Sequence, residues 1–503
     1  QEAPVKRIAH RTSPTNIGLS LLSNLAAVDF GYITAVQLLE RTANTITTMR
    51  SMERYKGHFY NWYDTRTLMP LNPKYISTVD SGNLAGHLLV LKQSLFSFSS
   101  FKVISPQLFD GIFDTANVLE ELNSSNEDIK DLVAHAKTFC ESRPIAPTTV
   151  RWYLEKLLDR SEKINLSGQS SLLIKSLNSL CKISLDEIDK WASWLFINEA
   201  PKKFEWLIQQ VSFIPTFGEL VRVNEFISAQ IKNFSTEEIT TEENHWLDQF
   251  EKSVADASRW AKDKISVADA LSQQCNFLSD MEFDFLYDGS QRLLAIGFHT
   301  DDQKRDAGFY DLLASESRLT VFIAIALGKI PQESWFALGR QLTNPGTSPI
   351  LLSWSGSMFE YLMPLLVMPA YDNTLLNQTD KTSVKKQIDY GEKRNVPWGV
   401  SESGYNMFDA NLNYQYKAFG VPGLGLKRGL GEELVIAPYA SAMALMVSPR
   451  EACNNLELLA QSNFSGDYGF FEAIDYTPAR LPPGQTHTVI RSFMSHHQGM
   501  SLL

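Results

Sequence analysis

The chain has 503 residues, of which 44% are hydrophobic and 20% charged, an ordinary globular balance with enough length for one large or several smaller domains. Its net charge of −11 argues against nucleic acid or an anionic membrane surface as a partner, because phosphate groups bind basic surfaces. There is no run of about 18 apolar residues and no CxxC spacing, so we expect no membrane span, disulfide framework or zinc site. The sequence begins with Gln1, and we expect it to be a piece of a longer protein.

The first hundred residues predict two helices, an aromatic hairpin and a third helix. Apolar residues recur at helical spacing within residues 17–48, and Pro14 marks the start of the first helix. Residues 57–70 are aromatic and extended, which is typical of a short hairpin. Ser77 and Asp80 have the spacing of a capping box, so we expect Asp80 in the first turn of a helix.

The middle of the chain differs in composition from both ends. Between residues 107 and 280 Glu and Lys increase, glycine decreases, and apolar residues recur at heptad-like spacing. We interpret residues 107–280 as a helical insertion without a motif that carries chemistry. It separates two parts of one catalytic domain, residues 1–106 and residues 281–503.

The pattern of the first hundred residues returns after residue 280. Residues 285–298 predict a hairpin with Asp-Gly at its turn, residues 311–327 predict a helix, and a last helix begins near Phe493. An aromatic hairpin followed by a helix therefore recurs along the chain. This recurrence predicts an all-α toroid of paired helices, with short aromatic hairpins gathered at a cleft.

Glu316 is the candidate general acid. In the predicted helix 311–327 it shares a face with leucines three and four residues away. A glutamate among apolar side chains is unfavourable unless it is paired or protonated, and burial raises a carboxyl pKa, which suits a general acid. The structural alternative is a buried ion pair with Arg318 or Arg66.

Glu402 is the second candidate carboxylate. It lies in a stretch marked by Pro397 and Gly399, between Trp398 and Tyr405. Aromatic faces beside a carboxylate suit a pyranose ring, whose C–H face stacks while its hydroxyls hydrogen-bond. Two carboxyls flanking a glycosidic bond are the usual equipment for glycoside chemistry, in which the second either attacks C1 or activates a water. The alternative for Glu402 is a solvated loop carboxylate.

Two further positions carry polar groups of interest. Asp80 is either a capping carboxylate at a helix start or a ligand to the sugar. His496 and His497 are adjacent on the last predicted helix and lack the HExxH spacing of a zinc site, so we expect hydrogen bonds to a sugar and no metal or cofactor. The candidate substrate-binding residues are Trp62, Asp80, Tyr310, Arg318, Trp354, Trp398, Tyr405, Glu472 and His497.

Several long motifs resemble the glycoamylase-like transglycosylation region of bacterial cyclic β-1,2-glucan synthases. The matching stretches are residues 58–64, 77–87, 310–316, 354–361, 396–403, 419–429 and 494–500. The resemblance covers nearly the whole chain, although residues 107–280 match less closely. Motifs of this length are specific, and chance agreement is implausible.

This resemblance implies an (α/α)6 toroid and the transglycosylation step that closes a linear β-1,2-glucan into a ring. It implies that Glu316 is the acid/base, Glu402 the nucleophile of a retaining mechanism, and Asp80 a ligand to the sugar at the cleaved bond. In the synthases this region lies between glycosyltransferase and phosphorylase-like domains, at the cytoplasmic side of the bacterial inner membrane. We therefore expect those domains as covalently linked partners, and the present fragment itself to be soluble.

Three functions follow as hypotheses. The first is a retaining transglycosylase that cyclises β-1,2-glucan. The second is an inverting endo-β-1,2-glucanase on the same fold, with water as the acceptor. The third is a glucan-binding domain without activity, which would have little use for a glutamate with a perturbed pKa.

Overall fold

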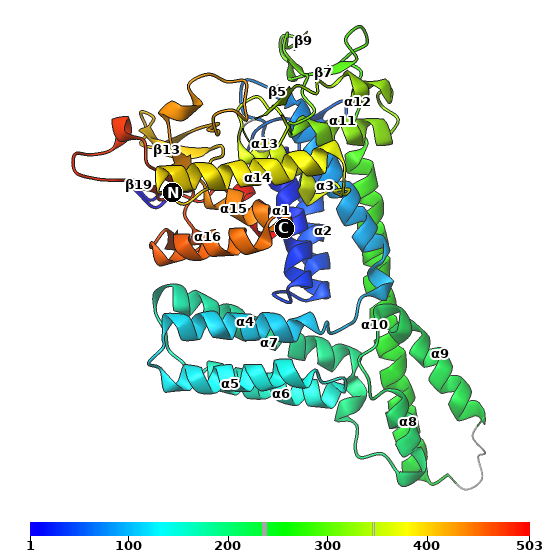
Figure 1. Cartoon of the computed structure of the whole chain (residues 1–503). Coiled ribbons are helices and arrows are strands. Elements are labelled where there is room, and N and C mark those ends of the chain that lie inside the picture. Colours follow the sequence, from blue (N-terminus) through cyan, green and yellow to red (C-terminus); the bar gives the residue numbers. More distant parts are fainter. Residues whose placement is uncertain (234–238, 345, 347) are drawn as a thin grey trace. The chain divides into compact units, whose positions relative to one another are not determined.

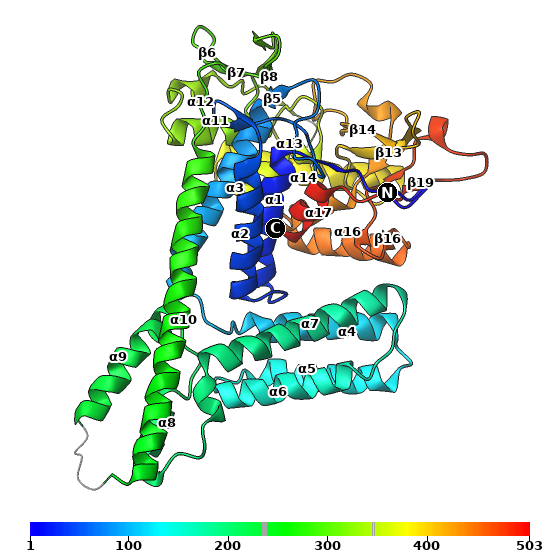
Figure 2. The same cartoon turned by 180° about the vertical axis from the view of Figure 1, so that it is seen from behind.

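The computed structural model describes the chain except for residues 234–238, 345 and 347 (Figures 1 and 2). The chain forms two compact units, a first unit of residues 1–23, 48–90 and 276–503, and a second unit of residues 24–47 and 91–275. The boundary falls within four helices, which are α1 (Pro14–Asp29), α2 (Ala35–Ser51), α3 (Thr78–Phe96) and α10 (Thr241–Ser279).

The second unit is built from helices. Besides parts of the four helices above, it contains α4 (Gln107–Leu122), α5 (Glu127–Ser142), α6 (Pro147–Ser161), α7 (Gly168–Trp191), α8 (Glu205–Gln210) and α9 (Phe217–Asn233). Helices α4 to α7 pack in chain order, and α4 also packs on α7, so these four form a bundle (Figure 1). In α5 the buried residues Ile129, Leu132, Ala136 and Phe139 recur at helical spacing and supply the core-facing stripe. The interpretation of residues 107–280 as a helical insertion, with these limits, stays a prediction.

The first unit contains shorter helices between short strands. Its remaining helices are α11 (Ser317–Ala326), α12 (Glu333–Ala337), α13 (Met358–Leu362), α14 (Leu375–Arg394), α15 (Pro438–Met443), α16 (Pro449–Gln461) and α17 (Ser495–Leu502). Helix α15 packs against α13, α16 and α17, and α13 also packs against α14. The last helix, α17, therefore packs on α15, which follows β13, β14 and β15 in the chain.

The strands form sheets of two or three strands. They are β1 (Arg11–Thr12), β2 (Arg54–Tyr55), β3 (His58–Phe59), β4 (Tyr63–Asp64), β5 (Tyr75–Ser77), β6 (Tyr287–Asp288), β7 (Leu293–Ala295), β8 (Gly297–His299), β9 (Lys304–Arg305), β10 (Phe309–Tyr310), β11 (Leu342–Thr343), β12 (Ile350–Leu351), β13 (Ser403–Phe408), β14 (Tyr414–Lys417), β15 (Val435–Ile436), β16 (Ser465–Gly466), β17 (Gly469–Phe470), β18 (Ala473–Asp475) and β19 (Thr488–Ile490). All pairings are antiparallel, with β6–β7–β10, β5–β8–β9 and β15–β18–β19 as the three-stranded sheets among the described residues.

Local sequence signals account for the helix starts around the site. Pro14 is the first residue of α1, as predicted. The Ser77 hydroxyl accepts a hydrogen bond from the Asp80 N–H at 3.3 Å, which is one half of the predicted capping box. Leu84, Leu88 and Leu91 are fully buried along α3, so its apolar stripe lies in the core.

Two of the predicted elements differ in the structure. The helix expected over residues 311–327 begins at Ser317, because Leu312 forms a bridge with Gly339, in which the Leu313 N–H donates to the Gly339 carbonyl and the Gly339 N–H donates to the Asp311 carbonyl. The hairpin expected within residues 57–70 forms around residues 65–67, where Tyr63 bridges to Pro70 and the Asp64 N–H donates to the Met69 carbonyl, but β4 also pairs with β1, which was not predicted. Sequence periodicity does not reveal either long-range pairing.

The predicted fold class is confirmed. The chain is all-α with successive helices and short hairpins, as the (α/α)6 prediction requires, and its sheet content is confined to small sheets. Among the described residues no helix combines the length and apolarity needed to cross a membrane.

Candidate active site

The segment before Glu402 is held in place by backbone geometry. Gly399 has φ of +129°, a conformation that L side chains rarely adopt, and an added Cβ would lie 3.1 Å from the Ala437 carbonyl oxygen. Val400 then bridges to Ile436 of β15, and β13 begins at Ser403. Glu402 is therefore placed between two paired segments on the first unit.

Two tyrosines contact Glu402. The Tyr416 hydroxyl donates to Glu402 Oε1 at 3.0 Å, and the Tyr439 hydroxyl donates to the Glu402 backbone carbonyl at 2.9 Å. Burial raises the pKa of Glu402 to about 7, while the charge of His497 and the Tyr416 hydrogen bond act in the opposite direction. The charged form of Glu402 is therefore favoured by His497 and Tyr416 and disfavoured by burial.

A histidine and a second glutamate lie behind Tyr416. His497 Nε2 lies 3.2 Å from the Tyr416 hydroxyl, and His497 Nδ1 lies 3.0 Å from Glu472 Oε2. The Tyr439 ring stacks on the His497 ring with centroids 3.7 Å apart. His497 is 1% exposed and Glu472 is 2% exposed, so both predicted substrate ligands are enclosed by protein partners.

Glu316 lies immediately before α11. It takes the N-cap position, but its side chain makes no capping hydrogen bond. Neither of the arginines suggested by the structural alternative pairs with it, since Arg318 faces Asp380 at 3.9 Å and Arg66 pairs with Asp64 at 2.8 Å. In the part of the chain that the structure describes, no cation lies within ion-pair distance of the Glu316 carboxyl.

The surroundings of Glu316 favour its protonated form. Burial raises its pKa well above the ordinary value, and the negative charges of Glu402, Glu360 and Asp80 raise it further. Burial and the charges of Glu316, Asp80 and Glu402 also raise the pKa of Tyr310. One site on the first unit therefore gathers these carboxyl groups around Tyr310.

Glu360 is a fixed anion beside this pair. Its carboxylate accepts hydrogen bonds from the Ser353 hydroxyl at 3.0 Å, the Trp354 N–H at 3.0 Å and the Ser357 hydroxyl at 3.1 Å, and it also accepts bonds from Ser355. It closes a capping box with Ser357 at the start of α13. Donors therefore face both oxygens of the Glu360 carboxyl.

Asp80 joins the site from the first turn of α3. The Thr15 hydroxyl donates to Asp80 Oδ1 at 2.5 Å. With its amide nitrogen toward Asp80, Asn61 donates to Oδ2 at 2.9 Å and accepts from Trp62 Nε1 at 3.3 Å. Burial raises the pKa of Asp80. The Asp80 carboxylate thus lies in the first turn of α3 and also accepts hydrogen bonds from side chains outside that helix.

The structure separates the other predicted binding residues into buried and open ones. Arg318 is 2% exposed and donates to the Glu360 and Tyr361 carbonyls, and Trp398 is 7% exposed and bonds through its backbone to Asn455, so both support the site from the core. Trp354 is 47% exposed, and Tyr405 is half-buried on β13. The Trp354 ring is therefore available to a ligand, whereas the Lys417 and Arg480 cations lie over the Tyr405 ring.

Sequence reasoning missed Tyr416 and Tyr439. In the β13–β14 hairpin Gly404 pairs with Tyr416, so a predicted hairpin over residues 403–417 would have placed Tyr416 beside Glu402. Tyr439 gave no signal, because it comes from α15, which meets the Glu402 segment only in the tertiary structure.

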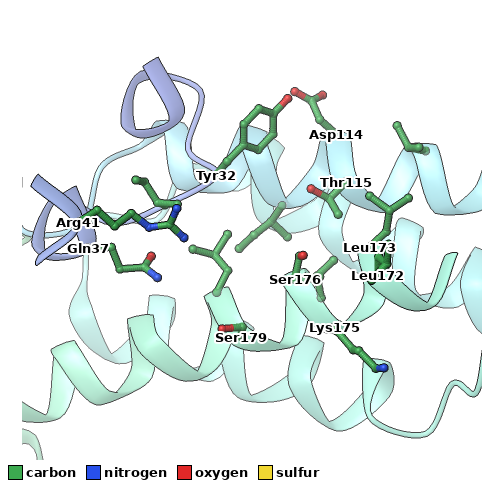
Figure 3. Close-up of a pocket in the computed structure, with 15 residues that line it drawn as sticks. Tyr32, Gln37, Arg41, Asp114, Thr115, Leu172, Leu173, Lys175, Ser176 and Ser179 are labelled. Atoms are coloured by element: carbon green, nitrogen blue, oxygen red, sulfur yellow. The ribbon is translucent and has the colours of Figure 1, made fainter. Parts of the chain in front are cut away.

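A hollow with different chemistry lies in the second unit. It measures about 640 Å³ and lies among side chains of α2, α4 and α7 (Figure 3). Asp114 is the carboxylate among its lining residues, beside the Tyr32 hydroxyl and several leucines. A single carboxylate does not supply two-carboxyl glycoside chemistry, so the candidate site is the one on the first unit.

The site on the first unit pairs an acid with a carboxylate. Burial raises the pKa of Glu316 well above its ordinary value, and it raises the pKa of Glu402 to about 7, where the charge of His497 and the Tyr416 hydrogen bond oppose the rise. In the described residues no group of three His, Cys, Asp or Glu side chains is arranged to hold a metal ion. Where the surroundings of two carboxyls give them different pKa values, the carboxyl with the higher pKa is suited to donate a proton. The other is suited to act as a nucleophile or base.

Comparison with known proteins gives related sequences over the whole chain. The glycoamylase family model, described as "Putative glucoamylase", matches residues 308–503. The cyclic β-(1,2)-glucan synthase NdvB of Rhizobium meliloti strain 1021 is 37% identical over 512 residues, which cover 100% of this chain and 16% of that protein. The resemblance predicted from the motifs is therefore confirmed, and this chain spans about one sixth of the relative's length.

A solved structure is also similar at low identity. The endo-β-1,2-glucanase from Chitinophaga pinensis, in complex with sophorotriose and glucose, has a TM-score of 0.48 and 12% identity, covering 98% of this chain and 81% of that one.

Proposed function

We propose, on the premise that this chain is homologous to one region of a cyclic β-(1,2)-glucan synthase, that it is a glycoside-hydrolase-like enzyme acting on β-1,2-glucan. In its finer form the proposal is a retaining transglycosylase that cleaves linear β-1,2-glucan and closes it into a ring. The observation that carries it is the pair Glu316 and Glu402, two carboxyls in one site. Burial and neighbouring charges raise the pKa of Glu316 well above its ordinary value, whereas burial raises the pKa of Glu402 to about 7 against the opposing effects of His497 and Tyr416.

In the proposed first step Glu316 gives its proton to the glycosidic oxygen while the Glu402 carboxylate attacks C1. The C1–O bond to the leaving chain breaks, and an ester between C1 and Glu402 forms. In the second step the ionised Glu316 takes the proton of a hydroxyl at the non-reducing end of the same chain. That oxygen attacks C1, Glu402 leaves as a carboxylate, and the ring is complete with Glu316 again protonated.

We assign the substrate contacts to the open side of the site. Asp80 and Tyr310 share the electrostatic environment of Glu316, and Trp62 lies beside Asp80 through Asn61. Trp354 offers an exposed aromatic face, and Tyr405 lies on β13, the strand that follows Glu402. We propose that these residues hold sugar units on either side of the cleaved bond, whereas Arg318, Trp398, Glu472 and His497 support the two carboxyls.

A purely glucan-binding domain is less consistent with the site. A binding surface has no need of a glutamate whose pKa burial and neighbouring carboxyls raise well above its ordinary value. An inverting endo-β-1,2-glucanase would use the same two residues with a water between them, and the product anomer separates it from the proposal.

Incubation of the 503-residue chain with linear β-1,2-glucan tests the reaction directly. We expect products lighter by one water than linear chains of equal length, and first products that keep the β-configuration in a proton NMR time course. Linear products with the α-configuration would establish inverting hydrolysis, and absence of any product would leave the binding hypothesis.

Azide rescue tests the two residue roles. In Glu402→Ala, azide replaces the missing nucleophile and should give an α-glycosyl azide by a single displacement. In Glu316→Ala, azide should attack the ester on Glu402 and give a β-glycosyl azide. Glu333→Ala, at an exposed position in α12, is the matched control and should behave as the wild type. No azide product from either site variant would refute these roles.

The homologous region is part of a larger protein, and we propose the same for this chain. Covalently linked glycosyltransferase and phosphorylase-like domains would make the linear glucan and adjust its length, at the cytoplasmic side of the inner membrane. Fractionation of cells that carry the full-length protein, followed by immunodetection of this region, tests that location. Recovery outside the membrane fraction would contradict it.

A further inference from the structure

Behind Glu402 the structure holds a continuous row of hydrogen-bonding groups. From Glu402 Oε1 the row runs to the Tyr416 hydroxyl at 3.0 Å, on to His497 Nε2 at 3.2 Å, and from His497 Nδ1 to Glu472 Oε2 at 3.0 Å. The four residues come from the segment before β13, from β14, from the segment before β18 and from α17. The row therefore exists only in the folded first unit.

The far end of the row has one arrangement of protons. The Gly404 N–H donates to Glu472 Oε1 at 3.0 Å, so this carboxylate acts as an acceptor there. Its Oε2 faces His497 Nδ1, and with Glu472 as a carboxylate the proton of this hydrogen bond lies on Nδ1. The Tyr439 ring, stacked at 3.7 Å, fixes the plane of the imidazole.

The near end has two arrangements, because the Tyr416 hydroxyl has a single proton to donate. When Glu402 is ionised, Tyr416 donates to it, and His497 Nε2 must then carry a proton to donate to the Tyr416 oxygen. When Glu402 is protonated, it donates to the Tyr416 oxygen, and Tyr416 donates to a His497 Nε2 without a proton. The two arrangements hold the same number of protons and differ by two hops.

We propose that Tyr416, His497 and Glu472 are positioning residues that form a proton relay, storing on His497 Nε2 the proton that Glu402 must lose to act as a nucleophile. The inference rests on the proposed function, in which Glu402 attacks C1. In the forward direction the Glu402 proton passes to the Tyr416 oxygen as the Tyr416 proton passes to Nε2. The result is a Glu402 carboxylate next to an imidazolium that Glu472 balances.

The other charged and titratable groups that face the relay fit this assignment. Burial and the neighbouring Glu402 charge raise the pKa of Tyr416 well above its usual value, so Tyr416 stays a neutral donor. His496 Nε2 lies 3.4 Å from the Tyr416 hydroxyl, and burial lowers the pKa of His496 well below its usual value, so it adds no charge. Tyr439 is also neutral, since burial and Glu402 raise its pKa.

Glu360 and Glu316 complete the surroundings of Glu402. Glu360 is an anion whose charge opposes ionisation of Glu402, and Glu316 is held protonated. The imidazolium is therefore the positive charge that offsets Glu360 at the nucleophile. In the ester intermediate Glu402 has no charge, and the imidazolium then favours its return as a carboxylate in the second step.

Nitrogen-15 NMR of the histidines in the 503-residue chain tests the relay without any turnover. At pH 7 we expect protons on both ring nitrogens of His497 in the wild type, and none on Nε2 in Glu402→Gln. The His497→Gln spectrum assigns the signals. A His497 Nε2 that lacks a proton in the wild type, or that keeps its proton in Glu402→Gln, would overturn the relay.

The pH dependence of kcat/KM gives a second test. Removing the imidazolium should move the acidic limb upward by about one pH unit, which is a tenfold loss at pH 6. Because His497→Gln leaves Glu472 buried and unpaired, we would also measure Glu472→Gln/His497→Gln, which keeps a neutral hydrogen-bonded pair. An acidic limb that stays in place in the double variant would overturn the proposal.

Matched variants separate the relay from a general structural effect. Tyr416→Phe removes the bridging hydroxyl and should lower kcat with little change in KM, whereas Tyr414→Phe, two residues away on β14, should match the wild type. An equal loss in both variants would overturn the role of Tyr416. If azide rescue at Glu402→Ala succeeds but the NMR spectra do not show the expected protons on His497, the relay alone is refuted. If azide rescue at Glu402→Ala fails, the proposed function is refuted.

Discussion

A buried glutamate far from the chemistry tests the electrostatic reasoning on which the site depends. Glu187, in α7 of the second unit, is 4% exposed; its Oε1 accepts a hydrogen bond from the Thr34 hydroxyl at 2.6 Å, and its Oε2 has no partner. Burial raises the pKa of Glu187 to about 7. The perturbation is Glu187→Gln, which keeps the shape and the acceptor for Thr34 but cannot ionise.

The magnitude follows from the two pKa values of Glu187. The folded state binds the proton more tightly than the unfolded chain, whose pKa is near 4.5, so the contribution to stability is complete below about pH 4.5 and is lost as pH rises through about 7. At 1.36 kcal/mol per pH unit, the difference corresponds to about 3 kcal/mol at pH 8 and above. Glu187→Gln should therefore gain up to that amount over the wild type.

The assay is denaturant unfolding at pH 5, 6, 7, 8 and 9, followed by tryptophan fluorescence. We expect the wild-type midpoint to fall relative to Glu187→Gln as pH rises, with the curves meeting near pH 5. Glu121→Gln, at an exposed position in α4 of the same unit, should follow the wild type at every pH. Parallel curves for wild type and Glu187→Gln would refute the argument from burial, at this position and by extension at Glu316.

Three further predictions concern the site itself. For the wild type, kcat/KM should rise through about pH 7 as Glu402 ionises and fall at higher pH as Glu316 loses its proton, and a profile that is flat from pH 5 to 8 would contradict this assignment. Asp80→Asn removes a negative charge that raises the Glu316 pKa, so the alkaline limb should move to lower pH; an unmoved limb would exclude that coupling. Gly399→Ala should lower the melting temperature through about 1–3 kcal/mol of backbone strain, whereas calorimetry of Gly289→Ala, which has open space around it, should show little change.

The predictions that succeeded rest on local signals. Pro14 opened α1 as its position predicted, and Ser77 caps α3 because a hydroxyl three residues before an N–H satisfies that donor in any context. The motifs around Glu316 and Glu402 indicated two carboxyls near aromatic residues, and the structure places both in one site. Local rules of this kind need no knowledge of the fold.

The predictions that changed depend on contacts between distant segments. Helix α11 begins at Ser317 because the preceding residues bond to the backbone near Gly339, which no periodicity reports. Trp398 is buried under residues from α16, although its flanking sequence resembles an open aromatic loop. Burial of a side chain is decided by what packs over it, and that partner lies elsewhere in the chain.

By itself the sequence determined the helical class, the two candidate carboxyls and the resemblance, because each depends on residue types that lie close together in the chain. The tertiary structure alone decided which carboxyl keeps its proton and which receives Tyr416, His497 and Glu472 as support. The physical reason is that a carboxyl pKa depends on desolvation and on charges within a few ångströms, and these come from segments up to several hundred residues apart.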